Sequence, residues 1–179
     1  MNDRIRKRTK NLTICAMLCA LGVILMTVGA FIEVLDLSTA ALASLLCIFV
    51  VIEIGGGYPW AVWAATSLLS LLLLPQKTPA IFYALFLGYY PVLKAYFERL
   101  PQWISWVLKL VTFHASLGLI YLCLKLFIPI ALEELGQSWL LLGTYGLALL
   151  CFIVYDFALS KLITAYLYRF RKYFQKMFK

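Results

Sequence analysis

The sequence predicts an all-α integral membrane protein, a single bundle of six transmembrane helices with both termini in the cytoplasm. Of its 179 residues, 64% are hydrophobic and 13% are charged, which leaves too little polar surface to cover a soluble domain. No composition shift, linker or internal repeat divides the chain, so we expect one membrane domain over residues 1–179. The apolar stretches and the basic residues between them predict the number and direction of the helices.

The first apolar stretch follows a basic tail, residues 1–11, and is long enough to cross a hydrocarbon core of about 30 Å at about 1.5 Å per residue. It is too long for the core of a signal peptide and has no obvious cleavage site, so we expect a retained helix. Five breaks rich in Gly, Pro or charged residues divide the rest of the chain. The second to fourth spans are short, so a broken or re-entrant segment is an alternative there. The predicted helices cover residues 12–32, 37–54, 58–74, 79–97, 103–128 and 139–167, and a basic tail covers 168–179.

The distribution of charge supports an even number of spans. With six spans, both tails lie on one side of the membrane, and most of the basic residues collect there. The positive-inside rule then places both tails in the cytoplasm and the acidic loops outside, as expected for a multi-pass protein of a bacterial plasma membrane. Because the basic residues flank apolar segments, the net charge of +8 is a topology signal and not a sign of nucleic-acid binding. The residues on the basic side are Arg4, Arg6, Lys7, Arg8, Lys10, Lys94, Arg99, Arg169, Arg171, Lys172, Lys176 and Lys179, with Lys109 and Lys161 near the same helix ends.

The chain lacks the sequence patterns of common catalytic sites. It has one histidine, so a metal site built on paired histidines is absent, and it contains neither a G-x-S-x-G elbow nor a Walker-type phosphate loop. The five cysteines lie in apolar spans and are expected to pack. Cys15 and Cys19 lie one helical turn apart, but no His or carboxylate accompanies them at ligand spacing. We therefore expect no enzyme activity, no cofactor and no metal.

His114 and Asp156 are the polar residues of the predicted spans that we consider as candidates for function, because ionisable groups inside a membrane are costly to keep. His114 is interpreted either as a ligand contact or as a buried polar bridge between helices. Asp156 precedes Lys161 by five positions, which places the two side chains about 140° apart around a helix and makes pairing between them poor. Asp156 is therefore expected to face the bundle interior, with His114, Lys109 or a substrate group as its partner, or to form a hydrogen bond that locks two helices together.

Ala16 and Ala20 lie four residues apart in an otherwise bulky apolar helix. Small residues at this spacing let another helix approach closely, which is a principal source of helix association in lipid. The same spacing occurs at Ala40/Ser44 and Ala61/Ala65, and most such pairs pack a protein's own helices. The first pair differs in position, because it lies in the cytoplasmic half of the first span, where a partner protein can reach it.

The chain resembles the substrate-binding S components of energy-coupling factor transporters in length, in its six helices and in the motif "AMLCA", Ala16 to Ala20. The resemblance implies that Ala16 and Ala20 dock on a transmembrane coupling subunit driven by two ATPases. It also implies capture of a vitamin or other micronutrient on the outer side, under the loops that follow the first, third and fifth spans.

In this interpretation, acidic and aromatic residues near the outer face favour a cationic or heteroaromatic ligand. Acidic outer loops also follow from topology, and anchoring at the membrane interface is the more usual role of a residue such as Trp139. The candidate substrate-binding residues are Glu33, Asp36, His114, Glu133, Glu134, Trp139, Tyr145 and Asp156.

On the inner side, residues 166–179 alternate basic and aromatic side chains, which predicts a helix that lies on anionic lipid. Lys94 and Arg99 are likewise expected to reach toward lipid headgroups.

Two other functions fit the same hydropathy. A membrane scaffold or envelope-assembly subunit would bind no small molecule. A membrane enzyme acting on lipid substrates would need an acid-base group such as Asp156 or His114.

The role of Asp156 can be tested by substitution. We expect Asp156→Ala to lower the yield of folded protein, measured as the monodisperse fraction after extraction in detergent, because the change removes a polar contact inside the membrane. An unchanged yield with loss of ligand binding would instead assign Asp156 to the substrate site.

Overall fold

The structure is a computed structural model that describes residues 2–32, 35–127 and 138–170. The chain forms two compact units, residues 1–121 and 122–179, and each is described by itself. All regular elements within the described residues are helical, which confirms the predicted all-α class.

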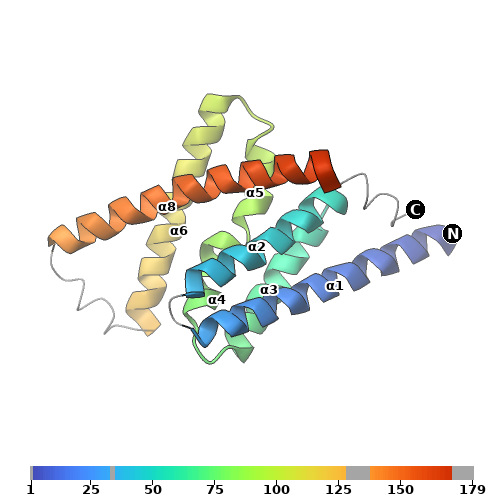
Figure 1. Cartoon of the computed structure of the whole chain (residues 1–179), viewed down its shortest axis with the longest axis horizontal. Helices are drawn as coiled ribbons and strands as arrows, with labels where there is room; N and C mark the ends of the chain where they lie inside the picture. Colours follow the sequence, from blue (N-terminus) through green and yellow to red (C-terminus); the bar gives the residue numbers. More distant parts are fainter. Residues whose placement is uncertain (1, 33–34, 128–137, 171–179) are drawn as a thin grey trace. The chain divides into compact units, whose positions relative to one another are not determined.

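The helices follow one another along the chain (Figure 1). The fourth apolar segment is divided into α4, a π-helical turn η2, and α5, while α6 continues from the first unit into the second. In chain order the elements are α1 (Asn2–Ala30), α2 (Asp36–Glu53), α3 (Tyr58–Leu73), α4 (Thr78–Phe82), η2 (Tyr83–Leu87), α5 (Tyr90–Phe97), α6 (Gln102–Phe127), α8 (Ser138–Ala165) and the π-helical turn η3 (Tyr166–Phe170).

These elements form six apolar helical segments close to the predicted positions. Five are long and apolar enough to cross a membrane, as expected of a multi-pass membrane protein. The exception is α3, which has 16 residues. The main difference in bounds is at the N-terminus, where α1 begins at Asn2 and so includes the basic tail predicted to precede the helix. The fourth segment is interrupted, in line with the broken-segment alternative.

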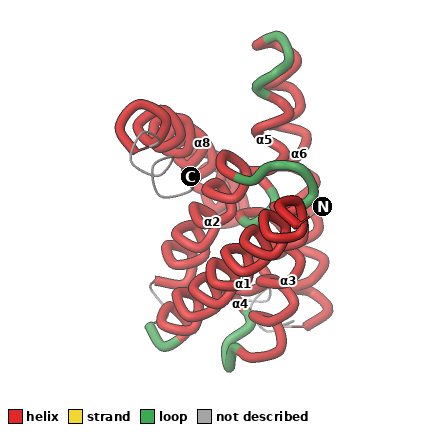
Figure 2. Tube along the Cα trace, turned by 90° about the vertical axis from the view of Figure 1, so that its right-hand side faces the viewer, coloured by secondary structure: helices red, strands yellow, loops and turns green. Residues whose placement is uncertain are grey.

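The first unit is organised around α1, which packs against α2 and α3 (Figure 2). Figure 1 shows α2 running back beside α1 after a short connection. The two helices come close together at Gly29, where an added Cβ atom would overlap the Thr39 side chain. Thr39 itself is held by its own helix, since its Oγ1 donates to the Asp36 carbonyl oxygen at 3.1 Å. A glycine is therefore required where α1 meets the first turns of α2.

Hydroxyl and sulfur atoms join α3 to α1. Thr66 Oγ1 donates to Cys19 Sγ at 3.2 Å, and Ser70 Oγ lies 3.9 Å from Met26 Sδ. All four side chains are buried. The cysteines of α1 therefore face the interior of the unit, as packing residues do. Among the described residues, no three His, Cys, Asp or Glu side chains gather in the way that metal ligands do.

A glycine turn joins α2 to α3 at the predicted break. The N–H groups of Ile54 and Gly55 both donate to the Val50 carbonyl oxygen, which ends α2. Gly55 and Gly56 have φ angles of 66° and 64°, a conformation that costs little only for glycine. Pro59 then occupies the first turn of α3, where its missing N–H leaves no hydrogen bond unmade.

In the second unit, α8 carries a chain of side-chain hydrogen bonds to its own backbone. Ser160 Oγ donates to the Asp156 carbonyl oxygen at 3.1 Å, and Thr164 Oγ1 donates to the Ser160 carbonyl oxygen at 2.8 Å. These contacts keep the hydroxyl groups satisfied within the helix, which a segment in lipid requires.

The close approach at Gly29 gives a stability prediction. We expect Gly29→Ala to destabilise the protein by about 1–3 kcal/mol and to lower its Tm by several degrees, because the new methyl group forces α1 and α2 apart. The measurement is thermal unfolding in detergent. Gly118→Ala is the control, since no atom lies within 4 Å of the added Cβ on α6, and it should cause no loss. Equal Tm values for the two variants would contradict the close approach.

Candidate functional site

The α1 notch, defined as Ala16 and Ala20, lies on the outward side of α1. Both alanines are exposed, whereas their neighbours Cys15 and Cys19 are buried against the rest of the first unit. Consecutive residues differ by about 100° around a helix, so the buried and exposed pairs lie on different faces. Met17 and Leu21 are exposed large side chains beside the notch. The notch is therefore a strip of small residues between bulky apolar ones.

The two other small pairs differ in burial. Ala40 and Ser44 are buried on the inner face of α2, so their small size serves packing inside the chain. Ala61 and Ala65 on α3 are exposed. Burial thus separates Ala40/Ser44 from the two exposed pairs, and it leaves the α1 notch and the α3 pair unused by the helices of the first unit.

Asp36 is the first residue of α2, and its side chain is buried. A carboxylate in the first turn of a helix is stabilised by the partial positive charge of the helix N-terminus. The Asp36 backbone carbonyl also accepts the hydroxyl of Thr39. This candidate binding residue is therefore buried at the start of α2, where the helix terminus favours its negative charge.

His114 lies on the exposed side of α6. Its Nδ1 is 2.8 Å from the Leu110 carbonyl oxygen, one turn earlier, and its ring meets the ring of Phe113 edge to face at 5.5 Å. Phe113 is buried. The histidine thus has the placement of an exposed side chain and not that of the buried bridge considered from the sequence.

Tyr145 and Asp156 belong to α8 in the second unit. Tyr145 is exposed and Asp156 is buried. The Lys161 ammonium lies 5.5 Å from the centre of the Phe157 ring, a cation–π distance, so its side chain has a contact of its own on α8.

The other predicted residues of the outer face fall outside the described residues. This applies to Glu33, Glu133 and Glu134 and to the side chain of Trp139, whose backbone belongs to α8. Within the first unit, Asp36 and His114 lie on different helices, at the start of α2 and in the middle of α6.

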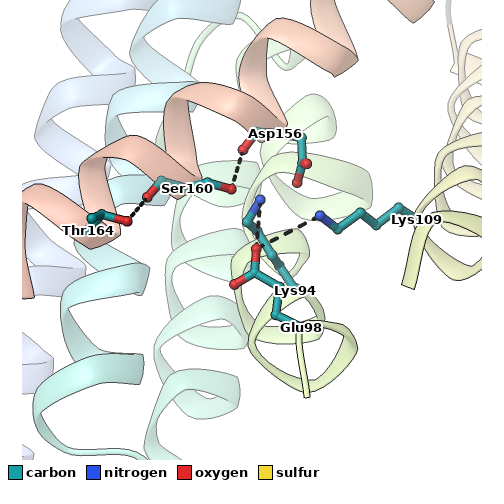
Figure 3. A network of polar contacts seen from close by, with 6 residues as sticks. All are labelled: Lys94, Glu98, Lys109, Asp156, Ser160 and Thr164. Carbon is teal, nitrogen blue, oxygen red and sulfur yellow. Dashed lines mark hydrogen bonds and ion pairs between the residues drawn. The ribbon is translucent and has the colours of Figure 1, made fainter. Parts of the chain in front are cut away.

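The structure adds an ionic cluster that the sequence did not predict, formed by Lys94, Glu98 and Lys109 (Figure 3). Lys94 Nζ lies 3.2 Å from Glu98 Oε1, and Lys109 Nζ lies 3.9 Å from the same oxygen. Lys94 is fully buried and Lys109 nearly so, while Glu98 is partly exposed. The prediction that Lys94 reaches toward lipid headgroups is therefore wrong, because its side chain is fully buried and its ammonium pairs with the Glu98 carboxylate. The i, i+4 spacing of Lys94 and Glu98 was the available sequence signal.

A second unpredicted feature surrounds the π-helical turn η2. The Gly88 N–H donates to the Tyr83 carbonyl oxygen at 2.7 Å, five residues back, and Trp63 Nε1 of α3 donates to the Ala84 carbonyl oxygen at 3.1 Å. The Trp63 ring meets the Tyr89 ring edge to face at 5.8 Å. A π-helical turn shifts the register of a helix by one residue and is common at functional sites.

Tyr89 links this aromatic group to α6. Its hydroxyl lies 2.6 Å from Ser116 Oγ, and Ser116 Oγ lies 2.6 Å from the Thr112 carbonyl oxygen. A serine has one hydroxyl proton, so when Ser116 donates to the carbonyl, Tyr89 must donate to Ser116. No sequence signal predicts this relay, because its members are distant along the chain.

Comparison of the chain with protein-family models, curated proteins and solved structures finds no match. We therefore infer function from the chain's own residues, chiefly the exposed α1 notch.

The ionic cluster gives a prediction for stability. We expect Lys94→Met to lower the Tm of the detergent-solubilised protein by a few degrees at most, at a cost of about 1 kcal/mol, because Glu98 loses its nearer cation while water and Lys109 still screen its charge. Lys161→Met, which removes an exposed ammonium from α8, is the matched control and should change stability by less than about 0.5 kcal/mol. A Lys94 variant as stable as the control would show that the pair contributes nothing.

Proposed function

We propose that this chain is the substrate-capture subunit of an importer of the energy-coupling factor type. It docks through Ala16 and Ala20 on a transmembrane coupling subunit that two ATPases drive. The observation that carries this proposal is the exposure of both alanines on α1.

The packing of the first unit supports docking at this surface. Helices in lipid gain little from the hydrophobic effect when they associate, so close contact between small residues matters more. The contacts of α1 with α2 and α3 use Gly29, Cys19 and Met26. The α1 notch, which lies on another face, is thus available to a separate protein.

The position of the notch along α1 also favours this function. It follows the basic residues of the first turns, from Arg4 to Lys10, which the positive-inside rule assigns to the cytoplasm. ATPases that drive a coupling subunit work on that side. The proposal therefore includes a bacterial plasma membrane, cytoplasmic termini and a chain that is not itself catalytic.

The substrate is proposed to bind at the opposite side of the membrane. Asp36 lies at the start of α2, just after α1 ends, and its carboxylate brings negative charge to that end of the unit. This charge favours a cationic or heteroaromatic micronutrient. The aromatic group around η2, with Tyr83 and Tyr90 fully buried, would act as a rigid support and not as a contact surface.

A membrane scaffold is the second candidate function. The exposure of Ala61 and Ala65 on α3 favours it, because a second strip of small residues would let the chain contact two neighbours at once. A scaffold would bind an envelope complex and no ATPase.

Co-purification from gently solubilised native membranes distinguishes the two functions. We expect the tagged protein to retain a membrane subunit and two ATPases. The amounts of these partners that co-purify with the Ala16→Leu/Ala20→Leu variant should be at least about tenfold lower, since bulky side chains prevent close helix contact. Quantitative mass spectrometry of the eluates measures the loss.

Ala61→Leu/Ala65→Leu is the matched control, with the same exchange on an exposed face of α3. It should retain the ATPases. Retention of all partners by the α1 variant, or absence of ATPases from the wild type, would refute the transporter assignment. Loss of an envelope complex from the α3 variant alone would favour the scaffold.

A further inference from the structure

A surface cavity of about 460 Å³ lies where the first turns of α1 meet the start of α3. It is in the first unit, at the basic end of α1 and away from the α1 notch. Five of its six lining residues carry a hydrogen-bond donor on the side chain, three of these donors are cationic, and none of the lining side chains is a carboxylate. The lining residues are Arg4, Ile5, Lys7, Arg8, Asn11 and Tyr58.

The lining residues of α1 follow a helical repeat. Arg4, Lys7, Arg8 and Asn11 have the spacing i, i+3, i+4 and i+7, which places them on one face of the helix. Arg6 and Lys10, the other cations of these turns, do not line the cavity. The three cations of this face therefore converge on one cavity, and a topology signal alone would not require that convergence.

Like charges one turn apart destabilise a helix in the absence of a counter-ion. An anion in the cavity would attract all three cations and so offset the repulsion among them. Tyr58 is the first residue of α3, so the partial positive charge of this helix terminus also lies beside the cavity. The charge of the site thus favours an anionic ligand.

The donor groups match a phosphate in particular. An arginine guanidinium can make two parallel hydrogen bonds to phosphate oxygens, and a lysine ammonium binds as a point charge. Asn11 supplies amide N–H groups and Tyr58 a hydroxyl. Two guanidinium groups, an ammonium and two neutral donors can satisfy the several oxygens of one phosphate.

The surroundings of the cavity indicate which kind of molecule bears the phosphate. Ile5 forms part of the wall, and Leu12, one turn beyond Arg8, is 58% exposed at the start of the apolar part of α1. A ligand at this site would have its phosphate in the cavity and an apolar portion against α1.

We propose that this cavity binds the phosphate of an anionic phospholipid headgroup, with the acyl chains along the exposed apolar surface of α1. The residues of this site, on α1 and α3, are different from residues 166–179, for which the sequence predicted contact with lipid and of which 171–179 lie outside the described residues. It does not depend on the transport function.

The test is a native mass spectrometry titration of the full-length protein in detergent with phosphatidylglycerol, and with phosphatidylcholine as the neutral comparison. Arg4→Gln/Arg8→Gln should weaken phosphatidylglycerol binding by about tenfold or more, because two charge-assisted donors are lost. Arg6→Gln/Lys10→Gln removes the same charge at the same spacing outside the cavity, and should change binding by less than about threefold.

Two further measurements test the role of the guanidinium groups and the nature of the ligand. Arg4→Lys/Arg8→Lys keeps both positive charges, so we expect this variant to fold like the wild type. It should still bind phosphatidylglycerol more weakly, because the guanidinium geometry is lost. Inorganic phosphate should compete only weakly with the lipid.

An equal loss of phosphatidylglycerol binding in the two Gln variants would show that binding depends only on the general surface charge. Binding of inorganic phosphate as strong as that of the lipid would show that free phosphate is the ligand. Either result would overturn the proposal.

Discussion

The close packing of α1 on α2 and α3 is the constraint on which the first unit depends. In a membrane the hydrophobic effect contributes little to helix association, so atoms must approach closely and polar groups must find partners. Gly29 meets Thr39 on α2, and Thr66 donates to Cys19 from α3. These contacts determine which face of α1 turns inward.

The inward face of α1 also determines which of its residues face outward. Once Cys15 and Cys19 are buried, Ala16 and Ala20 must lie on another side of the same turns. One helix thus offers an inner face for the chain's own packing and an outer face suited to a second protein. At its basic end, a third group of residues lines the cavity with Tyr58 of α3. The α1 notch and the phosphate-binding cavity therefore lie at different positions along α1 and differ in chemistry.

The polar groups of α5 and α6 show how the first unit keeps charge and hydroxyl groups inside a mostly apolar structure. Glu98 attracts both Lys94 and Lys109, so it joins the end of the fourth segment to α6. Tyr89 and Ser116 form a second connection between the same two segments. Both connections join groups on separate helices, and they set the position of α6 relative to α5.

The all-α class and the approximate bounds of the helices were predictable from composition and hydropathy. Hydropathy over about twenty residues is a property of consecutive residues, so it can be read without knowing the fold. The glycine turn after α2 was predictable for the same reason, because Gly55 and Gly56 are local signals. The inward side of each helix, in contrast, depends on how the helices pack. The apolar part of α1 is hydrophobic all round, so no polar stripe marks its exposed face.

The candidate site shows the same division. Spacing alone identified Ala16 and Ala20, but it identified Ala40 and Ser44 equally well, and burial was needed to tell the two pairs apart. The inward turn of Lys94 depends on where Glu98 and Lys109 lie. Short-range patterns thus determined the elements of this protein. Contacts between residues distant along the chain decided the packing, the buried charges and the surfaces left for other molecules.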